Sequence, residues 1–330
     1  MPEPLALLIL VIVAAIGFGI ANGFNDAANA IATVIGTRTL SPMTAIIMAA
    51  CCNFLGAATG TAVAITIGKG IISPEALTMN IVLAGTGAII IWALLATRYG
   101  MPISLTHGLV AGLVGAGIAI GGTEIIVWNV LTRVISAVGI APLLGFLGGF
   151  LLMLAIYWIF RRAAPDRIRT IFNPLQVISS AFLAYSHGKN DGQMPIGLIA
   201  MGLMAYSGTA EFAIPFWAVV VSAASISIGT AIGGQRVIKT LGLKITTLRP
   251  VQGFAANAAA ATVIEAASHF GIPVSTTHCA STAIMGVGAT KRLSAVRWGI
   301  ARSIVLTWVI TFPACGLLGW ILASLLKIVL

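Results

Sequence analysis

The chain has 330 residues, 59% of them hydrophobic and only 8% charged, whereas a soluble domain carries about 25% charged residues. Such a composition cannot cover a water-facing surface and excludes a soluble domain. The net charge of +10 does not indicate binding to nucleic acid. Most basic residues lie in short connections between apolar runs, where they orient membrane proteins.

Apolar runs of about 20 residues recur along the chain, which is enough to span a bilayer core as a helix. They include residues 43–66, 79–97, 140–160 and 213–233. Barrel strands need only about 9–11 alternating residues, so the runs predict an all-α polytopic membrane protein. The first run, Leu5–Ile20, follows Met-Pro-Glu-Pro rather than a basic region, and we expect it to be a retained span and not a signal peptide.

Three sequence motifs occur twice, in the same order in each half. The pairs are Gly23–Asp26 with Gly188–Asp191 (offset 165), Gly60–Ala62 with Gly229–Ala231 (offset 169), and Gly100–His107 with Gly271–His278 (offset 171). Three ordered matches are hard to explain by chance similarity among Gly- and Ala-rich helices. We therefore expect one transmembrane repeat at residues 1–160, a linker at 161–169 and a second repeat at 170–330.

The charges of equivalent connections differ between the two halves. The second-half connections 161–169, 234–249 and 291–292 are basic, whereas their first-half counterparts, which include Glu3, are neutral or acidic. At the two remaining pairs of connections the first-half member is the more basic one, because it contains Arg38 or Arg98. Because Lys and Arg favour the cytoplasm, the pattern predicts an inverted-topology repeat.

The same charges predict the topology in the membrane. We expect about ten net crossings, a cytoplasmic linker and both termini outside, with loops 98–102 and 269–273 on opposite sides. If the basic connections 161–169 and 234–249 both lie in the cytoplasm, the chain between them crosses the membrane an even number of times. The simplest solution is one interrupted crossing near His187–Gly192 and, in the first half, another around Ala21–Asp26. The sequence leaves open whether the two Pro-Ser-Thr-His segments cross the membrane or re-enter it.

Each Asn-Asp motif places a carboxylate inside a membrane segment. A charge at the bilayer centre costs from about 2.5 kcal/mol upward, so Asp26 and Asp191 are functional candidates. We expect Gly23 and Gly188 to break their helices and free backbone carbonyls. Together with the oxygens of the neighbouring amides, the two motifs predict a site for a small coupling cation. The amides are Asn25, Asn29 and Asn190.

Two further residues near these motifs are less informative. Glu265 has no counterpart in the first half, and His187 can simply close a hydrogen bond. Lys189 would compete with a cation unless it points away or meets an anion.

The motifs Pro-Ile-Ser-Leu-Thr-His and Pro-Val-Ser-Thr-Thr-His offer the opposite chemistry. Proline suits a first helical turn and hydroxyl residues suit a cap, so a helix should begin at each motif with free N–H groups. Helix N-termini and hydroxyl donors make an anion site. The predicted anion ligands are Ser104, Thr106, Ser275, Thr276 and Thr277, with His107 and His278 as weaker candidates.

Paired cation and anion elements predict a cation-coupled anion symporter whose substrate is an oxyanion such as phosphate or sulfate. A channel is the second class considered, but interrupted helices suit alternating access better. An enzyme is disfavoured because no nucleophile, metal set or cofactor motif occurs, and we expect no cofactor. The four cysteines lie in apolar segments without metal-ligand spacing.

The stretches "GFNDAANAIATVIGTR", "AYSHGKNDGQ" and "GIPVSTTHC" resemble the inorganic phosphate transporter family, which also includes sulfate permeases. The resemblance covers the whole chain and implies an inverted-repeat helical transporter of the cell (plasma or inner) membrane. It implies phosphate import with sodium or protons by a homodimer in the lipid bilayer. A sulfate permease of the same family is the alternative.

The resemblance also assigns residues. It makes Asn25, Asp26, Asn190 and Asp191 ligands of the substrate and of the coupling ion, with sodium as a candidate metal. Some members of the family carry glutamates where our alignment places Asn53 and Asn257, so these two residues are further coupling-ion candidates. The hydroxyl residues of both Pro-Ser-Thr-His motifs would hold the oxyanion.

Overall fold

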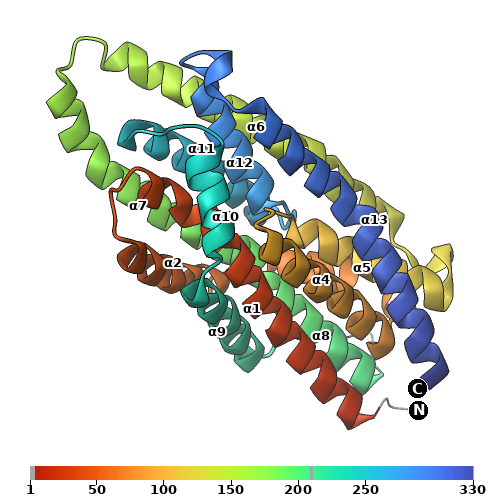
Figure 1. The fold of residues 1–330 in the computed structure, drawn as a ribbon. Helices are drawn as coiled ribbons and strands as arrows, with labels where there is room; N and C mark the ends of the chain where they lie inside the picture. The colour runs from red at the N-terminus through yellow and green to blue at the C-terminus, as the bar shows by residue number, and fades with distance from the viewer. Residues whose placement is uncertain (1–3, 209–210, 330) are drawn as a thin grey trace.

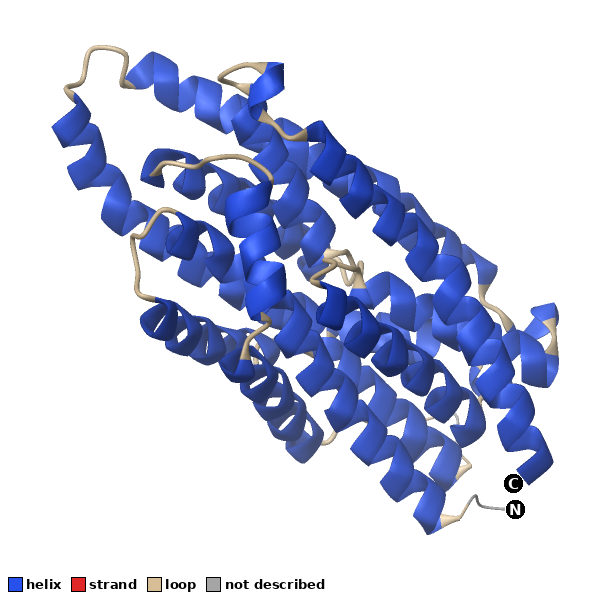
Figure 2. Cartoon of the chain, in the orientation of Figure 1, coloured by secondary structure: helices blue, strands red, loops and turns tan. Residues whose placement is uncertain are grey.

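The computed structural model describes residues 4–208 and 211–329, and the chain is folded into helices throughout this part (Figures 1 and 2). The α-helices are α1 Leu5–Gly36, α2 Pro42–Ala57, α3 Ala62–Gly70, α4 Met79–Tyr99, α5 Leu105–Gly121, α6 Trp128–Ile159, α7 Pro165–Asp191, α8 Gln193–Ser207, α9 Phe216–Ile232, α10 Gln235–Lys239, α11 Pro250–His269, α12 Thr276–Ala289 and α13 Trp298–Val329. Short 3₁₀ turns lie at Pro74–Ala76, Thr123–Ile125 and Leu293–Ala295, and a π-helical turn at Thr240–Lys244. Glu3, whose charge entered the topology prediction, lies outside the described residues.

Several helices are suited to a membrane. Over the described residues, α1, α4, α6 and α13 are long and apolar enough to cross a bilayer. The bent pairs α2 with α3 (65°) and α9 with α10 and the π-turn (63°) raise the number of candidate spans to six if each pair is one span. Exposed apolar side chains such as Leu151 on α6 and Val309 on α13 would be unfavourable in water. The chain is therefore an all-α polytopic membrane protein.

Two helical hairpins, α4–α5 and α11–α12, meet tip to tip near the middle of the protein, where Figure 2 shows their loops in tan. The first helix of each hairpin is followed by a glycine with a positive φ, 68° at Gly100 and 66° at Gly271, which only glycine adopts without strain. The tips touch, because the Thr106 hydroxyl donates a hydrogen bond of 3.1 Å to the backbone oxygen of Val274.

This contact corrects the predicted topology. Ten crossings would place loops 98–102 and 269–273 on opposite membrane surfaces, about 30 Å apart. The two tips instead lie at the same depth, in hydrogen-bond contact. The Pro-Ser-Thr-His segments therefore do not begin at opposite surfaces, and the count of about ten crossings does not hold.

The predicted helix breaks at Gly23 and Gly188 are also wrong. α1 runs without interruption through Ala21–Asp26, and Gly188 lies inside α7. Near His187–Gly192 the chain changes only from α7 to α8, and Gly192 between them keeps helical angles (φ −66°, ψ −17°). No backbone carbonyls are freed by unwinding at either motif.

The two glycines instead allow helices from opposite halves to touch. A Cβ atom at Gly23 would lie 2.0 Å from the backbone oxygen of Ile226 in α9. A Cβ atom at Gly188 would lie 2.2 Å from the backbone oxygen of Asn53 in α2. Small residues at such crossings let membrane helices pack closely, because lipid supplies no hydrophobic force between them.

A second glycine contact in each helix pair changes the alignment of the two halves. Gly229 of α9 faces the backbone oxygen of Ile20, and Gly56 of α2 faces that of Tyr185, both at about 2 Å from a built Cβ. Gly56 is thus the counterpart of Gly229. Gly60, which the sequence match paired with Gly229, lies in the turn before α3 with φ 129°.

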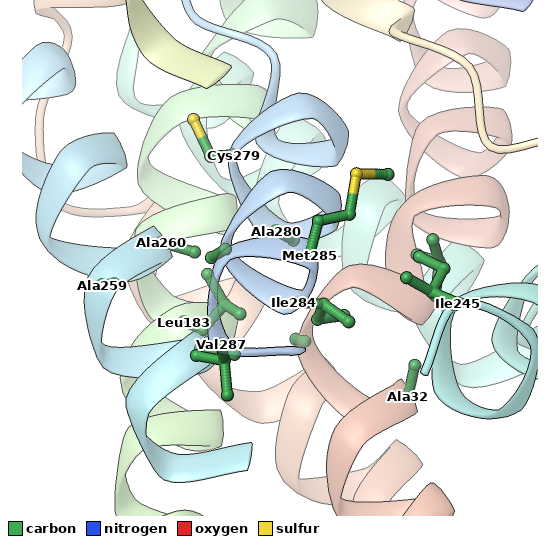
Figure 3. Packing of buried hydrophobic residues seen from close by; sticks show 14 of the residues in the cluster. Ala32, Leu183, Ile245, Ala259, Ala260, Cys279, Ala280, Ile284, Met285 and Val287 are labelled. Atoms are coloured by element: carbon green, nitrogen blue, oxygen red, sulfur yellow. The ribbon is translucent and has the colours of Figure 1, made fainter. Parts of the chain in front are cut away.

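The largest group of buried apolar residues surrounds α12, and every residue of this helix is buried. Figure 3 shows Ala280, Ile284 and Val287 of α12 among side chains from α1, α7 and α11. Alanines such as Ala259 and Ala260 bring the backbone of α11 close to α12. This packing buries α12 at the centre of the protein and contributes to the position of its N-terminus.

We expect Gly188→Ala to lower the free energy of unfolding by about 1–3 kcal/mol, because the added methyl group would overpack the crossing with α2. The measurement is the melting temperature of the purified protein in detergent. Gly139→Ala in α6 is the matched control, since a Cβ there meets nothing within 4 Å. Equal melting temperatures for both variants would contradict the role given to Gly188.

Candidate functional site

Asp26 on α1 and Asp191 at the end of α7 lie buried beside the first turn of α12. The Thr277 hydroxyl donates to Asp26 Oδ1 over 2.9 Å. The Thr276 hydroxyl lies 3.3 Å from Asp26 Oδ2 and 3.4 Å from Asp191 Oδ2. The positive end of the helix dipole adds to this stabilisation of negative charge. The structure thus unites the two Asn-Asp motifs with one anion motif, which the sequence presented as separate elements.

His187 and Asn22 complete the surroundings of the two carboxylates. His187 Nε2 lies 3.5 Å from Asp191 Oδ2 and 3.9 Å from Asp26 Oδ2. Asn22 Nδ2 donates to Asp191 Oδ2 over 3.2 Å. The sequence analysis missed Asn22 and gave His187 little weight. The offset of 165 that relates Asp26 to Asp191 also relates Asn22 to His187, and this signal could have identified both.

A directed chain of hydrogen bonds holds the imidazole of His187. The Thr230 hydroxyl donates to the backbone oxygen of Ile226 (2.9 Å) and accepts from Asn53 Nδ2 (2.7 Å). Asn53 Oδ1 is therefore left to accept from His187 Nδ1, at 2.8 Å. With its proton on Nδ1, His187 turns Nε2 toward the carboxylates. Asn53 orients His187 through this hydrogen bond and does not itself contact Asp26 or Asp191.

Asn25 and Asn190 tie the two aspartates to the two hairpins. Asn25 Nδ2 donates to the hydroxyl of Thr97 in α4 over 2.6 Å. Asn190 Nδ2 donates to Asp191 Oδ1 (2.6 Å) and to the backbone oxygen of Val274 (2.8 Å). Asn190 therefore links the α11–α12 hairpin directly to the carboxylate of Asp191, whereas Asn25 links the α4–α5 hairpin to the residue next to Asp26.

Three buried asparagines lie within four residues of Asp26 along α1. Asn22, Asn25 and Asn29 each have an Oδ1 atom that is buried without a hydrogen-bond partner among the described residues. A buried polar atom without a partner is costly, so these oxygens are candidates to bind a ligand or an ordered water. Hard oxygen atoms of this kind suit a small cation. Asn29 Nδ2 meanwhile donates to Thr277 over 3.0 Å.

A second set of cation ligands lies between the helices. Asp26, His187 and Asp191 each offer one ligand atom, and these atoms lie within 4.8 Å of one another. Asn257, the other predicted coupling-ion residue, only accepts a hydrogen bond of 3.0 Å from Thr33 and does not reach the carboxylates.

Ser104 and Ser275 are the N-caps of α5 and α12, as their motifs predict. Each hydroxyl accepts a hydrogen bond of 3.2 Å from the backbone N–H of the histidine three residues later. The proline of each motif lies two residues before the cap and not in the first helical turn, which corrects that detail. Leu105 stands where α12 has Thr276, so the two hairpin tips are chemically different.

His107 and His278 pack against each other where the tips meet, with ring centroids 4.9 Å apart. His278 also lies against Trp308 (3.8 Å), and His107 stacks on Phe312 (5.2 Å). Neither imidazole makes a hydrogen bond or ion pair with Asp26 or Asp191 within the described part of the chain. Their contacts are those of packed aromatic rings.

Lys189 forms an ion pair with Glu265 of α11 and so meets an anion. The lysine points away from Asp191 and does not compete for the cation site. Both side chains are partly buried, with 18% and 27% of their surface exposed. The equivalent positions in the first half are Phe24 and Leu94, so the pair has no counterpart there.

Lys189→Met should destabilise the protein by about 2 kcal/mol, because Glu265 would keep a partly buried charge without a partner. The double variant Lys189→Met with Glu265→Leu should regain most of the loss, and the two melting temperatures measure this. Additive losses in the double variant would show that the ion pair is not the relevant interaction.

Comparison with known proteins identifies the family of the chain. The model of the phosphate transporter family matches residues 22–166 and 160–319. A probable low-affinity inorganic phosphate transporter of Rhizobium meliloti (strain 1021) is 44% identical over 316 residues, which cover 95% of this chain and 94% of the relative. A protein of the same description from Bacillus subtilis (strain 168) is 39% identical over 98% of both chains.

A solved structure, described as the sodium-dependent phosphate transporter, has the same fold. It matches with a TM-score of 0.90 and 27% identity, over 99% of this chain and 100% of that one. The relatives are named as transporters, and the family is not a family of enzymes. The chain belongs to the phosphate transporter family.

Proposed function

We propose that the protein is a secondary active symporter that imports inorganic phosphate across the cell membrane with a coupling cation, by alternating access. The observation that carries the proposal is the contact of Thr276 and Thr277 with Asp26 and Asp191. The N-terminus of α12 supplies anion donors, and the carboxylates beside it need cations. The substrate phosphate and the cation would therefore share one site.

Electrostatics would couple the two ligands. Two like charges 4 Å apart repel by about 4 kcal/mol at an effective dielectric constant of 20. A phosphate dianion beside Asp26 and Asp191 would bind poorly until cations neutralise the carboxylates. Binding of cation and anion would thus be linked, as symport requires.

Phosphate fits the site better than sulfate does. Both are tetrahedral anions, but only phosphate keeps a proton to donate. Asp26 and Asp191 are acceptors within hydrogen-bond distance of the hydroxyls that would hold the anion. Sulfate would meet these carboxylates without a proton to offer. The names of the relatives, which specify inorganic phosphate, support the same choice.

Sodium is the coupling ion that the site favours. Three asparagines near Asp26 along α1 have amide oxygens without partners among the described residues, and neutral oxygens together with carboxylates suit a hard monovalent cation. The structural neighbour is described as sodium-dependent. His187 between the two carboxylates is the observation that keeps the proton as the alternative.

The proposed topology is an inverted repeat with six crossings and two re-entrant hairpins. The crossings are α1, α2–α3, α6, α7–α8, α9–α10 and α13. Equivalent contacts in the two halves support it, such as Asn25 with Thr97 and Asn190 with Ser268. Repeats 1–160 and 170–330 would then be joined by a cytoplasmic linker at 161–169, with both termini outside. We extend the proposal to a homodimer in the lipid bilayer, as the family resemblance implies.

The direct test is uptake of radiolabelled phosphate into proteoliposomes under an imposed sodium or proton gradient, with sulfate as competitor. We expect uptake that follows the sodium gradient and is unaffected by sulfate. If the proton gradient alone drives uptake, the coupling ion is the proton and not sodium. Uptake of sulfate that phosphate does not inhibit would overturn the substrate assignment, and uptake down its own gradient without coupling would indicate a channel.

Asp26→Asn and Asp191→Asn should each reduce coupled uptake at least a hundredfold, because each removes a charge on which cation binding depends. Initial rates in proteoliposomes measure the loss, and size-exclusion profiles check folding. Asp166→Asn, at an exposed position in the first turn of α7, is the matched control and should transport normally. Normal uptake and cation dependence in either test variant would contradict the assignment.

A further inference from the structure

A cavity of about 560 Å³ opens beside the site, between the end of α4 and the start of α10. Its lining includes Phe24, Thr97, Arg98, Gln235 and Arg236. Thr97 is the partner of Asn25, the neighbour of Asp26. One threonine side chain thus belongs both to the cavity and to the network of the site.

The charge of this cavity is entirely positive. Its described lining contains two guanidinium groups and no carboxylate. Arg236 donates to the backbone oxygen of Arg98, whereas the guanidinium of Arg98 makes no hydrogen bond or ion pair within the described residues. A concave surface with charge of one sign concentrates ions of the opposite sign.

Arg98 is not an ordinary loop charge that orients the chain. It lies at the tip of the α4–α5 hairpin, which meets the other tip near the middle of the protein. A charge at membrane depth is costly and by default indicates a functional site. The next residue toward the site is Thr97, so the charge stands beside the path to Asn25.

The second half differs at the equivalent positions. Phe24 and Leu94 line the cavity, whereas their counterparts Lys189 and Glu265 are joined in an ion pair. At these two positions the first half therefore has apolar side chains where the second half has an ion pair, and the counterpart of Arg98 is His269.

We propose that the cavity is a vestibule in which Arg98 and Arg236 bind the phosphate group of free phosphate on its way to or from Asp26 and Asp191. The inference rests on the proposed function. Both arginines are exposed, so solvent screens their charge and a phosphate held by them would exchange and pass Thr97 to reach the hydroxyls of α12. The phosphate group of an anionic lipid has the same chemistry and is the source that the test must separate.

The experiment measures equilibrium exchange of radiolabelled phosphate in proteoliposomes of phosphatidylcholine and phosphatidylethanolamine. Exchange loads both faces of the protein, so the result does not depend on its orientation. The variant Arg98→Gln with Arg236→Gln should raise the half-saturating phosphate concentration about tenfold, with a maximal rate within about twofold of wild type. High salt should shrink the difference. Arg98→Lys with Arg236→Lys should keep most of the wild-type affinity, and Arg302→Gln on exposed α13 is the matched control.

Three results would overturn the vestibule. They are an unchanged half-saturating concentration, an equal rise with Arg302→Gln, and an effect that appears only when phosphatidylglycerol is added, which would assign the arginines to a lipid headgroup. Wild-type protein that exchanges no phosphate would instead refute the proposed function itself.

A second measurement covers the case in which the double glutamine variant does not fold. Leu94→Cys, in a Cys51→Ala background, places a thiol in the cavity. Phosphate should slow its labelling by an anionic thiol reagent at least threefold, but should not slow labelling of Ala164→Cys in the exposed linker. Equal labelling rates with and without phosphate at both positions would overturn the proposal.

Discussion

Two carboxylates inside the membrane require compensation, and the first turn of α12 supplies it. Thr276 and Thr277 contact Asp26 and Asp191, and the dipole of a wholly buried helix points at the same place. Neither partner is stable there alone: a bare carboxylate is expensive at this depth, and helix N–H groups without acceptors are costly as well. The position of α12, and with it the α11–α12 hairpin, therefore depends on the aspartates.

The glycines of the Asn-Asp motifs bring those aspartates into place by packing. Gly23 lets α1 cross α9 with backbone contact, and Gly188 lets α7 cross α2 in the same way. Each half therefore packs closely against a helix of the other half. In a bilayer such close crossings replace the hydrophobic force that would assemble a soluble core. The same contacts hold Asn53 one hydrogen bond away from His187. Structure and site are thus fixed by one set of helix crossings.

Much of this could be predicted from the sequence, because it depends on local chemistry that is repeated. The helical class, the serine caps of α5 and α12, and the choice of Asp26 and Asp191 as site candidates all follow from residue type and from matched spacing. The helix breaks were wrong because glycine favours both unwinding and close packing, and only the neighbouring helix decides between them. The ten crossings failed for a similar reason. The charge of Arg98 is the same at a membrane surface and at a hairpin tip, and only the contact of Thr106 with Val274 distinguishes the two places.

The departures from symmetry are where the chemistry of a single substrate must lie. A two-fold arrangement of identical halves would offer identical ligands on both sides of its axis, but one asymmetric transport cycle needs sides that can differ. At equivalent positions of the two halves, Asn22 corresponds to His187 and Leu105 corresponds to Thr276. Phe24 and Leu94 correspond to the ion pair of Lys189 and Glu265. Each difference changes charge or hydrogen-bonding capacity within reach of Asp26, Asp191 or their anchoring asparagines. The residues that the two halves share, such as the two Asn-Asp pairs and the capping serines, form the common frame of the site, and the residues that break the repeat give the two halves different charge and hydrogen-bonding groups.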